Sequence, residues 1–252
     1  MIPLERRQKI MELVGIRGVI SITELVENLG VSHMTVRRDL QKLEQEGLVV
    51  QVSGGVQILK KLNAEPLLSV RQNMATAEKA RIGKAAASRI PEGACIYLDA
   101  GTTALAVAQN IASRSDLTII SNDSTVMTYL ASRTESELIH LGGHLRKKTL
   151  SCVGPLAANT LAQFSIDVAF ISASSWDARG ITTPDMEKVT LKKAVSQASL
   201  NKILITDSSK YGQVATFIAL PLTEFSTIIT DKGLPETARQ LVRHQNVELE
   251  LV

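Results

Sequence analysis

The chain has 252 residues, 44% of them hydrophobic, and a formal net charge of +3. This length suits a small domain followed by a medium-sized one, no apolar run approaches the roughly 18–20 residues of a membrane span, and the charged N-terminus is unlike a signal peptide. We therefore expect a cytoplasmic protein with no membrane partner, whose mild positive charge permits a nucleic-acid partner without demonstrating one.

The first part of the chain has the pattern of short helices followed by a hairpin. Residues 4–14 carry apolar side chains at helical spacing,. Ser21 and Glu24 have the spacing of a capping box at the start of a second helix, and Ser32 is placed to cap a third,. Two short β runs then flank a glycine pair,. This order predicts a small α+β winged helix-turn-helix domain over residues 1–58.

The third helix is expected to bury Val36, Leu40 and Leu43 and to turn its polar face outward,. In a helix-turn-helix, the second helix of the motif lies in the major groove, which aims Arg38 at a guanine. The candidate DNA-binding residues are Ser32, His33, Met34, Thr35, Arg37, Arg38, Gln41 and Lys42. The alternative is a solvated amphipathic helix, since residues 1–60 hold eight Lys or Arg against seven Asp or Glu.

Residues 59–76 contain Pro66 and little periodicity, and we interpret them as a linker. From 77 to 252, helical and apolar β patterns alternate, which predicts an α/β domain whose largely parallel sheet is covered on both faces. The expected strands are 94–98, 117–120, 137–141, 167–171, 202–206, 227–229 and 247–251. The expected helices are 78–90, 103–112, 126–132, 187–200 and 235–244.

Five of the expected strands are followed directly by small residues with a hydroxyl, amide or carboxylate group. Ligands of open α/β sheets bind at the carboxyl ends of the strands, and a glycine–threonine loop before a helix can cradle a phosphate. The candidate effector-binding residues are Asp99, Gly101, Thr102, Thr103, Ser121, Asn122, Asp123, Ser172 and Lys210. Taken singly, most of these residues have the alternative role of a helix N-cap, and Lys210 that of a surface lysine.

The string SITELVENLGVSHMTVRRDLQKLEQEGLV, followed by SGGV, resembles the DNA-binding module of DeoR-type bacterial transcription regulators. The resemblance continues through LDAGTT, SND, SCVG, DVAF and DSSKYG, and the second half is also similar to the fold of ribose-5-phosphate isomerases and CoA transferases. It implies a repressor of a sugar or carbon-metabolism operon, controlled by a phosphorylated sugar or sugar-acid effector. Its DNA partner would be a double-stranded operator with repeated half-sites, bound by a homodimer or homotetramer.

Two stretches depart from the family pattern. The wing has Gln51, Val52 and Ser53 where the family has a basic residue and a histidine before the glycines. Trp176 stands where a small residue is usual, and it is expected either to cover the ligand or to pack in the core. The basic loop Gly142–Thr149 likewise has two interpretations, closure over an anion or simple solvation.

The alternative function is a sugar-phosphate isomerase or deaminase that carries an added DNA-binding domain. Such chemistry needs a positioned carboxylate whose pKa is tuned by its pocket. The isomerases have paired acids in an Asp-Gly-Ala-Asp-Glu string, whereas the corresponding place here runs from Ser172 to Asp177 and offers one acid. We therefore expect a regulator and no enzyme, with no cofactor and no metal.

Overall fold

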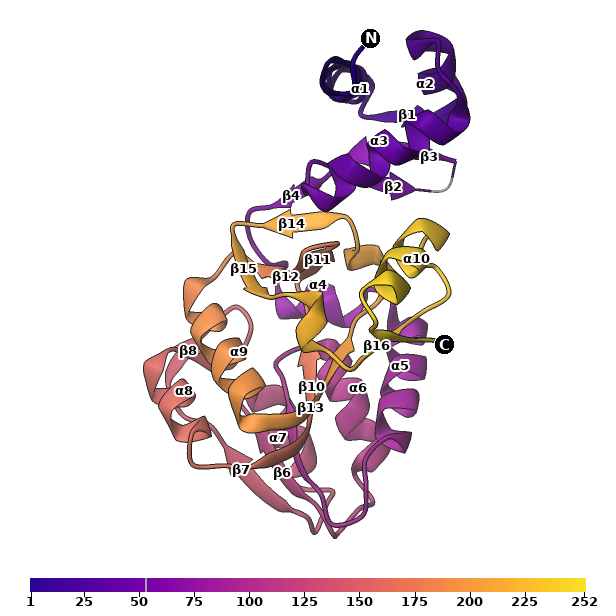
Figure 1. Ribbon diagram of the computed structural model, residues 1–252. Coiled ribbons are helices and arrows are strands. Elements are labelled where there is room, and N and C mark those ends of the chain that lie inside the picture. Colours follow the sequence, from indigo (N-terminus) through magenta and orange to yellow (C-terminus); the bar gives the residue numbers. More distant parts are fainter. Residues whose placement is uncertain (53) are drawn as a thin grey trace.

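Three helices and a small antiparallel sheet form the N-terminal module (Figure 1). In this computed structural model, which describes residues 1–52 and 54–252, the elements are α1 (Pro3–Arg17), β1 (Val19–Ser21), α2 (Ile22–Leu29), α3 (His33–Gln45), β2 (Val49–Val52) and β3 (Gly55–Ile58). The strand order β1-β3-β2 adds one strand to the expected hairpin. Ser53, which the sequence places in the wing, lies outside the described residues.

The expected caps begin α2 and α3. The Ser21 Oγ accepts a hydrogen bond from the Glu24 N–H at 3.1 Å, and the Glu24 carboxylate accepts one from the Ser21 N–H at 2.9 Å,. The Ser32 Oγ accepts from the Thr35 N–H at 3.2 Å. One core joins the apolar faces and contains Ile10, Val14, Ile20, Leu25, Leu29, Val36, Leu40, Leu43, Val49 and Val56. The caps fix where α3 begins, and the core fixes which of its faces remains in solvent.

The second part of the chain is built on a seven-stranded sheet in which every neighbouring pair is parallel. The strand order is β17-β16-β13-β10-β5-β6-β7. The strands are β5 (Cys95–Leu98), β6 (Thr118–Ser121), β7 (Glu137–His140), β10 (Ile166–Ser172), β13 (Ser199–Ile205), β16 (Thr227–Thr230) and β17 (Glu248–Leu251). All seven expected strands are confirmed. The central strands β5, β6 and β10 are largely apolar because helices cover both of their faces, whereas the edge strands β7 and β17 also carry polar residues,.

Helices cover both faces of this sheet, as predicted. They are α5 (Thr76–Ser88), α6 (Thr102–Ile111), α7 (Ser124–Leu130), α8 (Pro155–Leu161), α9 (Met186–Ala198) and α10 (Glu236–His244). On β10, Phe170 packs in the core that contains α5, α6 and α7, whereas Ala169 and Ile171 pack in the core that contains α8, α9 and α10. Successive side chains thus enter opposite layers, as the two-residue period of a strand requires. Helix α8, which has seven residues, is the one of these six helices that the sequence pattern missed.

Short elements connect the two parts of the chain. The segment interpreted as a linker holds β4 (Lys60–Leu62) and α4 (Leu68–Gln72), and β4 pairs in parallel with β14 (Gln213–Ala215) below the N-terminal module in Figure 1. The remaining elements are β8 (His144–Arg146), β9 (Ser151–Val153), β11 (Ser175–Asp177), β12 (Gly180–Thr183), β15 (Phe217–Leu220) and the 3₁₀ turns Ser208–Lys210 and Leu222–Glu224. Among the described helices, none combines the length and the apolar character needed to cross a bilayer.

Candidate functional site

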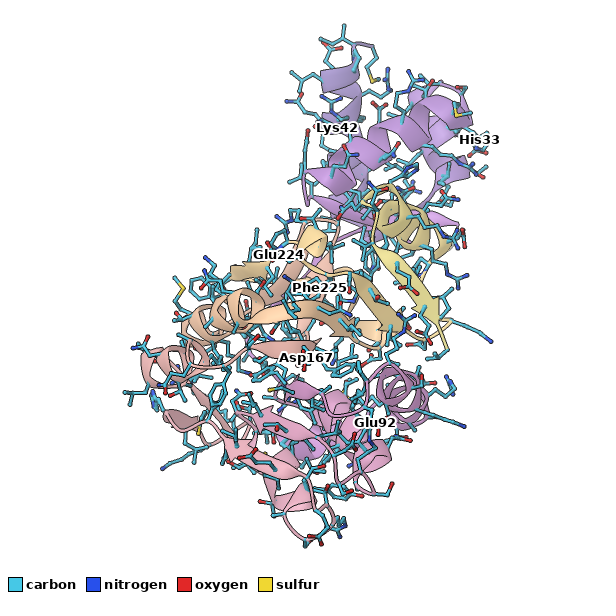
Figure 2. The ribbon with its side chains drawn as sticks, turned by 60° about the horizontal axis from the view of Figure 1, so that its bottom comes forward. His33, Lys42, Glu92, Asp167, Glu224 and Phe225 are labelled. Carbon is cyan, nitrogen blue, oxygen red and sulfur yellow. The ribbon has the colours of Figure 1, made fainter. Side chains whose placement is uncertain are left out.

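The outward face of α3 carries the side chains predicted to meet DNA. Val36, Leu40 and Leu43 are buried, while the opposite side of the helix is open to solvent; Met34, for example, is 71% exposed. The exposed candidates are Ser32, His33, Met34, Arg37, Arg38, Gln41 and Lys42, and Thr35 is half-buried. His33 and Lys42 mark the two ends of this surface in Figure 2. The helix therefore offers a mainly polar and cationic face.

Two acids that weaken the charge balance of the module are turned away from this face. Asp39 is buried and accepts hydrogen bonds from Arg6 of α1, one of them at 3.2 Å from Nη2. Glu44 is also buried and accepts from the backbone N–H and the side-chain amide of Gln51 at 3.1 and 2.8 Å. The near-neutral count of charges in residues 1–60 thus understates how positive the exposed face of α3 is.

A cavity opens at the carboxyl ends of β5, β10 and β13, where an open α/β sheet is expected to bind its ligand. Seven of the nine candidate effector residues line it: Asp99, Gly101, Thr102, Thr103, Asn122, Ser172 and Lys210. Asn122 already bonds to the protein, since its Oδ1 accepts from the Tyr97 hydroxyl and its Nδ2 donates to the Cys152 carbonyl, both at 2.8 Å. The other two candidates, Ser121 and Asp123, lie outside the cavity wall.

Ser121 and Asp123 hold the binding loop in place from behind. The Asp123 Oδ1 caps α7 by accepting from the Thr125 and Val126 N–H groups at 2.7 and 3.0 Å. Its Oδ2 accepts from the Gly101 N–H at 2.9 Å, and its own N–H donates to the Ser121 Oγ at 3.0 Å. Burial raises the pKa of Asp123. In this structure the two residues support the loop, and Asp123 has the N-cap role left open above,. Their direct contact with a ligand stays a prediction.

The loop before α6 has the geometry of an anion site. Gly101 has φ = +124°, a conformation that residues with a Cβ rarely adopt, and a Cβ there would lie 3.4 Å from the Arg71 Nη1,. The first N–H groups of a helix have no partner within that helix, which leaves the start of α6 able to receive an anion. Among the described residues, the buried Thr103 Oγ1 and the Arg71 Nε and Nη2 have no hydrogen-bond partner.

Asp99 fixes the other side of this loop. Its Oδ2 accepts from the Ser172 N–H at 3.0 Å and from the Lys192 ammonium group. The Ser172 Oγ lies 3.1 Å from the same Oδ2 and 2.7 Å from the Ala100 carbonyl oxygen, and its one hydrogen is donated to one of these two acceptors at a time,. Because Asp99 and Ser172 are bonded to each other and to the loop, they set the shape of the cavity as well as lining it.

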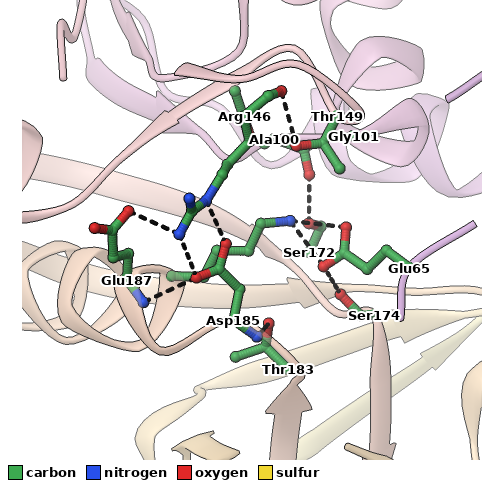
Figure 3. A network of polar contacts seen from close by, with 12 residues as sticks. Glu65, Ala100, Gly101, Arg146, Thr149, Ser172, Ser174, Thr183, Asp185 and Glu187 are labelled. Carbon is green, nitrogen blue, oxygen red and sulfur yellow. Dashed lines mark hydrogen bonds and ion pairs between the residues drawn. The ribbon is translucent and has the colours of Figure 1, made fainter. Parts of the chain in front are cut away.

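Glu65 is the centre of a second network in the cavity wall (Figure 3). Its carboxylate accepts from the Lys188 ammonium group at 2.7 Å and from the Ser174 hydroxyl at 2.6 Å, and it lies 3.9 Å from the Arg71 Nη1. Burial alone would raise the pKa of Glu65, but the charge of Lys188, together with the hydrogen bonds from Lys188 and Ser174, outweighs burial and holds the pKa at about 2. Glu65 is therefore ionised at neutral pH.

The cavity contains more positive than negative charge. Its ionisable side chains are the cations Arg71, Lys79, Lys188, Lys192 and Lys210 and the carboxylates Glu65, Asp99 and Asp207. Three lysines each pair with one carboxylate: Lys188 with Glu65, Lys192 with Asp99, and Lys210 with Asp207 at 3.5 Å. Arg71 shares the Glu65 carboxylate with Lys188, and Lys79 has no carboxylate within ion-pair distance among the described residues. The five cations thus exceed the three carboxylates by two.

The environment of Lys79 shows the effect of this excess. Its ammonium group donates to the Arg71 and Met74 carbonyls at 2.7 and 2.5 Å, and burial, followed by the charge of Lys210, lowers its pKa to about 8. Burial also lowers the pKa of Lys210. A bound anion would relieve both lysines, so the arrangement favours a negatively charged ligand.

Six charged residues of the cavity wall are absent from the candidates named from the sequence: Glu65, Arg71, Lys79, Lys188, Lys192 and Asp207. Lys188 and Lys192 are four residues apart on α9, and this spacing places them on one face of the helix. That spacing was the one feature of the sequence that could have indicated the two lysines. No pattern in the sequence indicates Glu65 or Arg71, because they lie in the segment interpreted as a linker.

Three residues whose roles the sequence left open, Trp176, Asp177 and Arg146, are not part of the cavity wall. Trp176 is fully buried, and its ring stands edge-on to that of Tyr211 with the centroids 4.9 Å apart, so it packs in the core and is not part of the cavity wall. Asp177, the single acid of the enzyme alternative, is buried in an ion pair with Arg179 at 2.6 Å, also away from the cavity. In the basic loop, Arg146 points to Asp185 and Glu187 in Figure 3, and the ion pairs measure 2.7 and 2.8 Å.

Comparison with known proteins identifies the family. Residues 74–232 match the DeoR C-terminal sensor domain, and residues 6–62 match the DeoR-like helix-turn-helix domain. The chain is 52% identical to the uncharacterized HTH-type transcriptional regulator YgbI of Escherichia coli, with 99% of this chain and 98% of that protein aligned. It is 31% identical to the glycerol-3-phosphate regulon repressor of Escherichia coli, with 98% of each aligned.

Among solved structures, ribose 5-phosphate isomerase A of Methanocaldococcus jannaschii aligns with 53% of each chain at 16% identity and a TM-score of 0.38. The two matched domains together span most of the chain, and the two relatives that are named as regulators align with nearly all of it. The chain therefore belongs to the DeoR family and is a DNA-binding transcriptional regulator, not an enzyme.

Proposed function

We propose that this regulator is a repressor of a sugar or carbon-metabolism operon and that a phosphorylated sugar or sugar acid, bound in the cavity described above, controls it. One observation carries the proposal: the buried guanidinium of Arg71 lies beside Gly101 at the start of α6, with its Nε and Nη2 unpartnered among the described residues. A guanidinium next to a helix N-terminus is suited to bind a phosphate through charge-assisted hydrogen bonds.

The charge of the cavity supports a phosphate monoester. A phosphate ester carries about −1.5 to −2 charges at neutral pH, and Arg71 and Lys79 are the two cations left after the lysine–carboxylate pairs are formed. The polar groups around the ion pairs are suited to the hydroxyls of a polyol; they are the side chains of Asn122, Ser174, Ser209 and Gln213. The glycerol-3-phosphate regulon repressor, a relative by sequence, is named for a phosphorylated polyol.

For DNA binding, we propose that α3 enters the major groove and that Arg38 and Gln41 read bases there. Ser32, His33, Met34, Thr35, Arg37 and Lys42 complete the contact surface, with the basic residues on phosphates, which position the helix without specifying sequence. Repeated half-sites would be bound by a homodimer or homotetramer. Light scattering after gel filtration tests this assembly, and a monomeric mass at micromolar concentration would contradict it.

A ligand screen tests the cavity assignment. Glycerol 3-phosphate, aldose phosphates, phosphorylated sugar acids and the matching unphosphorylated compounds are added to the protein, and the unfolding temperature is measured. We expect only phosphorylated compounds to raise it, by mass action on the folded state. R71M should abolish the rise, whereas R81M, which removes an exposed arginine of α5, should retain it. A rise that survives R71M, or one produced equally by unphosphorylated sugars, would contradict the proposal.

A further inference from the structure

We propose that Tyr211 is a positioning residue that connects the effector cavity to the recognition helix α3. The proposal rests on the proposed function for the identity of the cavity, but the contacts that carry it lie outside the cavity. Tyr211 is neither a candidate ligand residue nor a candidate DNA contact. It follows Lys210 directly in the motif DSSKYG.

The first link is the short turn that precedes Tyr211. Asp207, Ser209 and Lys210 line the cavity, and Tyr211 follows directly. The Lys210 N–H donates to the Asp207 carbonyl at 3.2 Å, and the Tyr211 N–H donates to the Ser208 carbonyl at 3.1 Å. Because these residues form one hydrogen-bonded 3₁₀ turn, a ligand that displaces Lys210 also displaces Tyr211.

The second link joins this turn to α3. The Tyr211 hydroxyl donates to the Glu44 Oε1 at 2.8 Å, and both residues are buried. Glu44 lies in the last turn of α3, and the same carboxylate accepts the two hydrogen bonds from Gln51 in the wing. Burial and the charge of Glu44 hold the pKa of Tyr211 well above its ordinary value, so the hydroxyl remains a donor. One buried carboxylate thus joins the recognition helix, the wing and the sensor domain.

Two neighbouring contacts make this end of α3 dependent on the sensor domain. The guanidinium of Arg179 lies against Gly47, where an added Cβ would be 2.2 Å from its Cζ. Gly212 lies against Val50, and its carbonyl accepts a hydrogen bond from the Lys60 N–H at 3.1 Å. A movement of the turn before Tyr211 therefore reaches the end of α3 through packed and hydrogen-bonded groups, which are able to carry energetic coupling between two sites.

The chain carries its own reporter for this movement. Trp176 is its only tryptophan, and the Tyr211 ring lies edge-on against it. We would measure Trp176 fluorescence while adding a generic duplex of about 30 base pairs at low salt, where non-specific binding uses the same DNA-binding surface. The wild type is expected to change its emission as the duplex binds. Y211F keeps the ring and removes the hydroxyl, and it should bind the duplex with a reduced emission change; Y129F, a substitution away from this contact, should behave as the wild type.

The second measurement uses inorganic phosphate as a probe of the cavity, with chloride holding the ionic strength constant. In the wild type, saturating phosphate should change duplex affinity by about 5-fold or more, the range usual for allosteric coupling. In Y211F the factor should fall below about 2-fold while the affinity for phosphate stays within about 2-fold of the wild type. Y129F should retain the wild-type factor.

The outcomes separate this proposal from the proposed function. Three results would each overturn the coupling role of Tyr211. Phosphate could change the duplex affinity of Y211F as much as that of the wild type, or it could bind the wild type without changing duplex affinity. The third is a wild type whose Trp176 emission stays constant as the duplex binds. If phosphate does not bind the wild type, the cavity assignment loses its support, and the duplex measurement still decides whether Tyr211 reports on α3.

Discussion

Replacing Glu65 by glutamine should destabilise the sensor domain in a pH-dependent way. The side chain of Glu65 is 8% exposed, and its pKa is about 2 in the folded protein against an ordinary value of 4.5. Since one pKa unit corresponds to about 1.4 kcal/mol, the folded state favours the ionised form by about 3 kcal/mol more than the unfolded state does. Glutamine keeps the shape of the protonated acid and loses this preference, so E65Q should unfold more easily by about 3 kcal/mol at neutral pH.

The direction of the pH dependence follows from the lowered pKa. Between about pH 5 and pH 2, the unfolded state binds the proton more readily, so the contribution of Glu65 is present above its unfolded pKa and is lost as the pH falls. Urea unfolding followed by Trp176 fluorescence measures the free energy of unfolding of the wild type, E65Q and the exposed control E92Q. The difference between wild type and E65Q should shrink as the pH is lowered towards 3. A difference below about 1 kcal/mol at neutral pH, or one independent of pH, would refute the role assigned to Lys188 and Ser174 in lowering the pKa of Glu65,.

Three further outcomes are expected. R38A should weaken binding to the operator, once identified, by about 1–3 kcal/mol and relax base preference at one position, whereas R81A should leave operator titrations unchanged; equal effects would place the reading face elsewhere. Phosphate affinity, measured by calorimetry, should fall several-fold from about pH 7 to about pH 9. The reason is that Lys79, whose pKa is about 8, must take up a proton at the higher pH before it can pair with the anion,. K79M should reduce this dependence of phosphate affinity on pH. G101A should lower the free energy of unfolding by about 1–3 kcal/mol, because Ala is strained at φ = +124°,, and it should also weaken phosphate binding; an unchanged unfolding curve would contradict the assigned strain.

Much of the fold follows from local patterns. The apolar runs locate all seven strands of the parallel sheet, and they are clearest in the central strands, where burial on both faces favours apolar residues,. The buried side of α3 follows from the spacing of Val36, Leu40 and Leu43, and Ser21 and Ser32 cap the helices as their positions predict. These features depend on neighbours a few residues away, which the sequence shows directly.

The charged half of the cavity depends on contacts between distant residues. Lys192 meets Asp99 across 93 residues, and Lys188 meets Glu65 across 123. A lysine on a helix is usually solvated, so composition and spacing alone give it no partner. Glu44 could not be predicted for the same reason, because its partner is distant in sequence. Its place in the last turn of α3 gives no sign that its carboxylate accepts a hydrogen bond from Tyr211, 167 residues away. The strand ends indicated where the cavity lies, and tertiary packing determined the charge of its wall.

The segment between the two matched domains has a consequence for how such regulators are recombined. Residues 63–73 belong to neither matched domain, yet Glu65, Pro66 and Arg71 form part of the cavity wall. A chimaera that joins this DNA-binding module to the sensor of a relative should therefore be cut before β4, so that the incoming sensor keeps its own connecting segment. A cut near residue 74 would give the foreign sensor the Glu65 and Arg71 of this chain. If the cavity binds the effector as proposed, substitutions in this short stretch would change ligand preference without altering either matched domain.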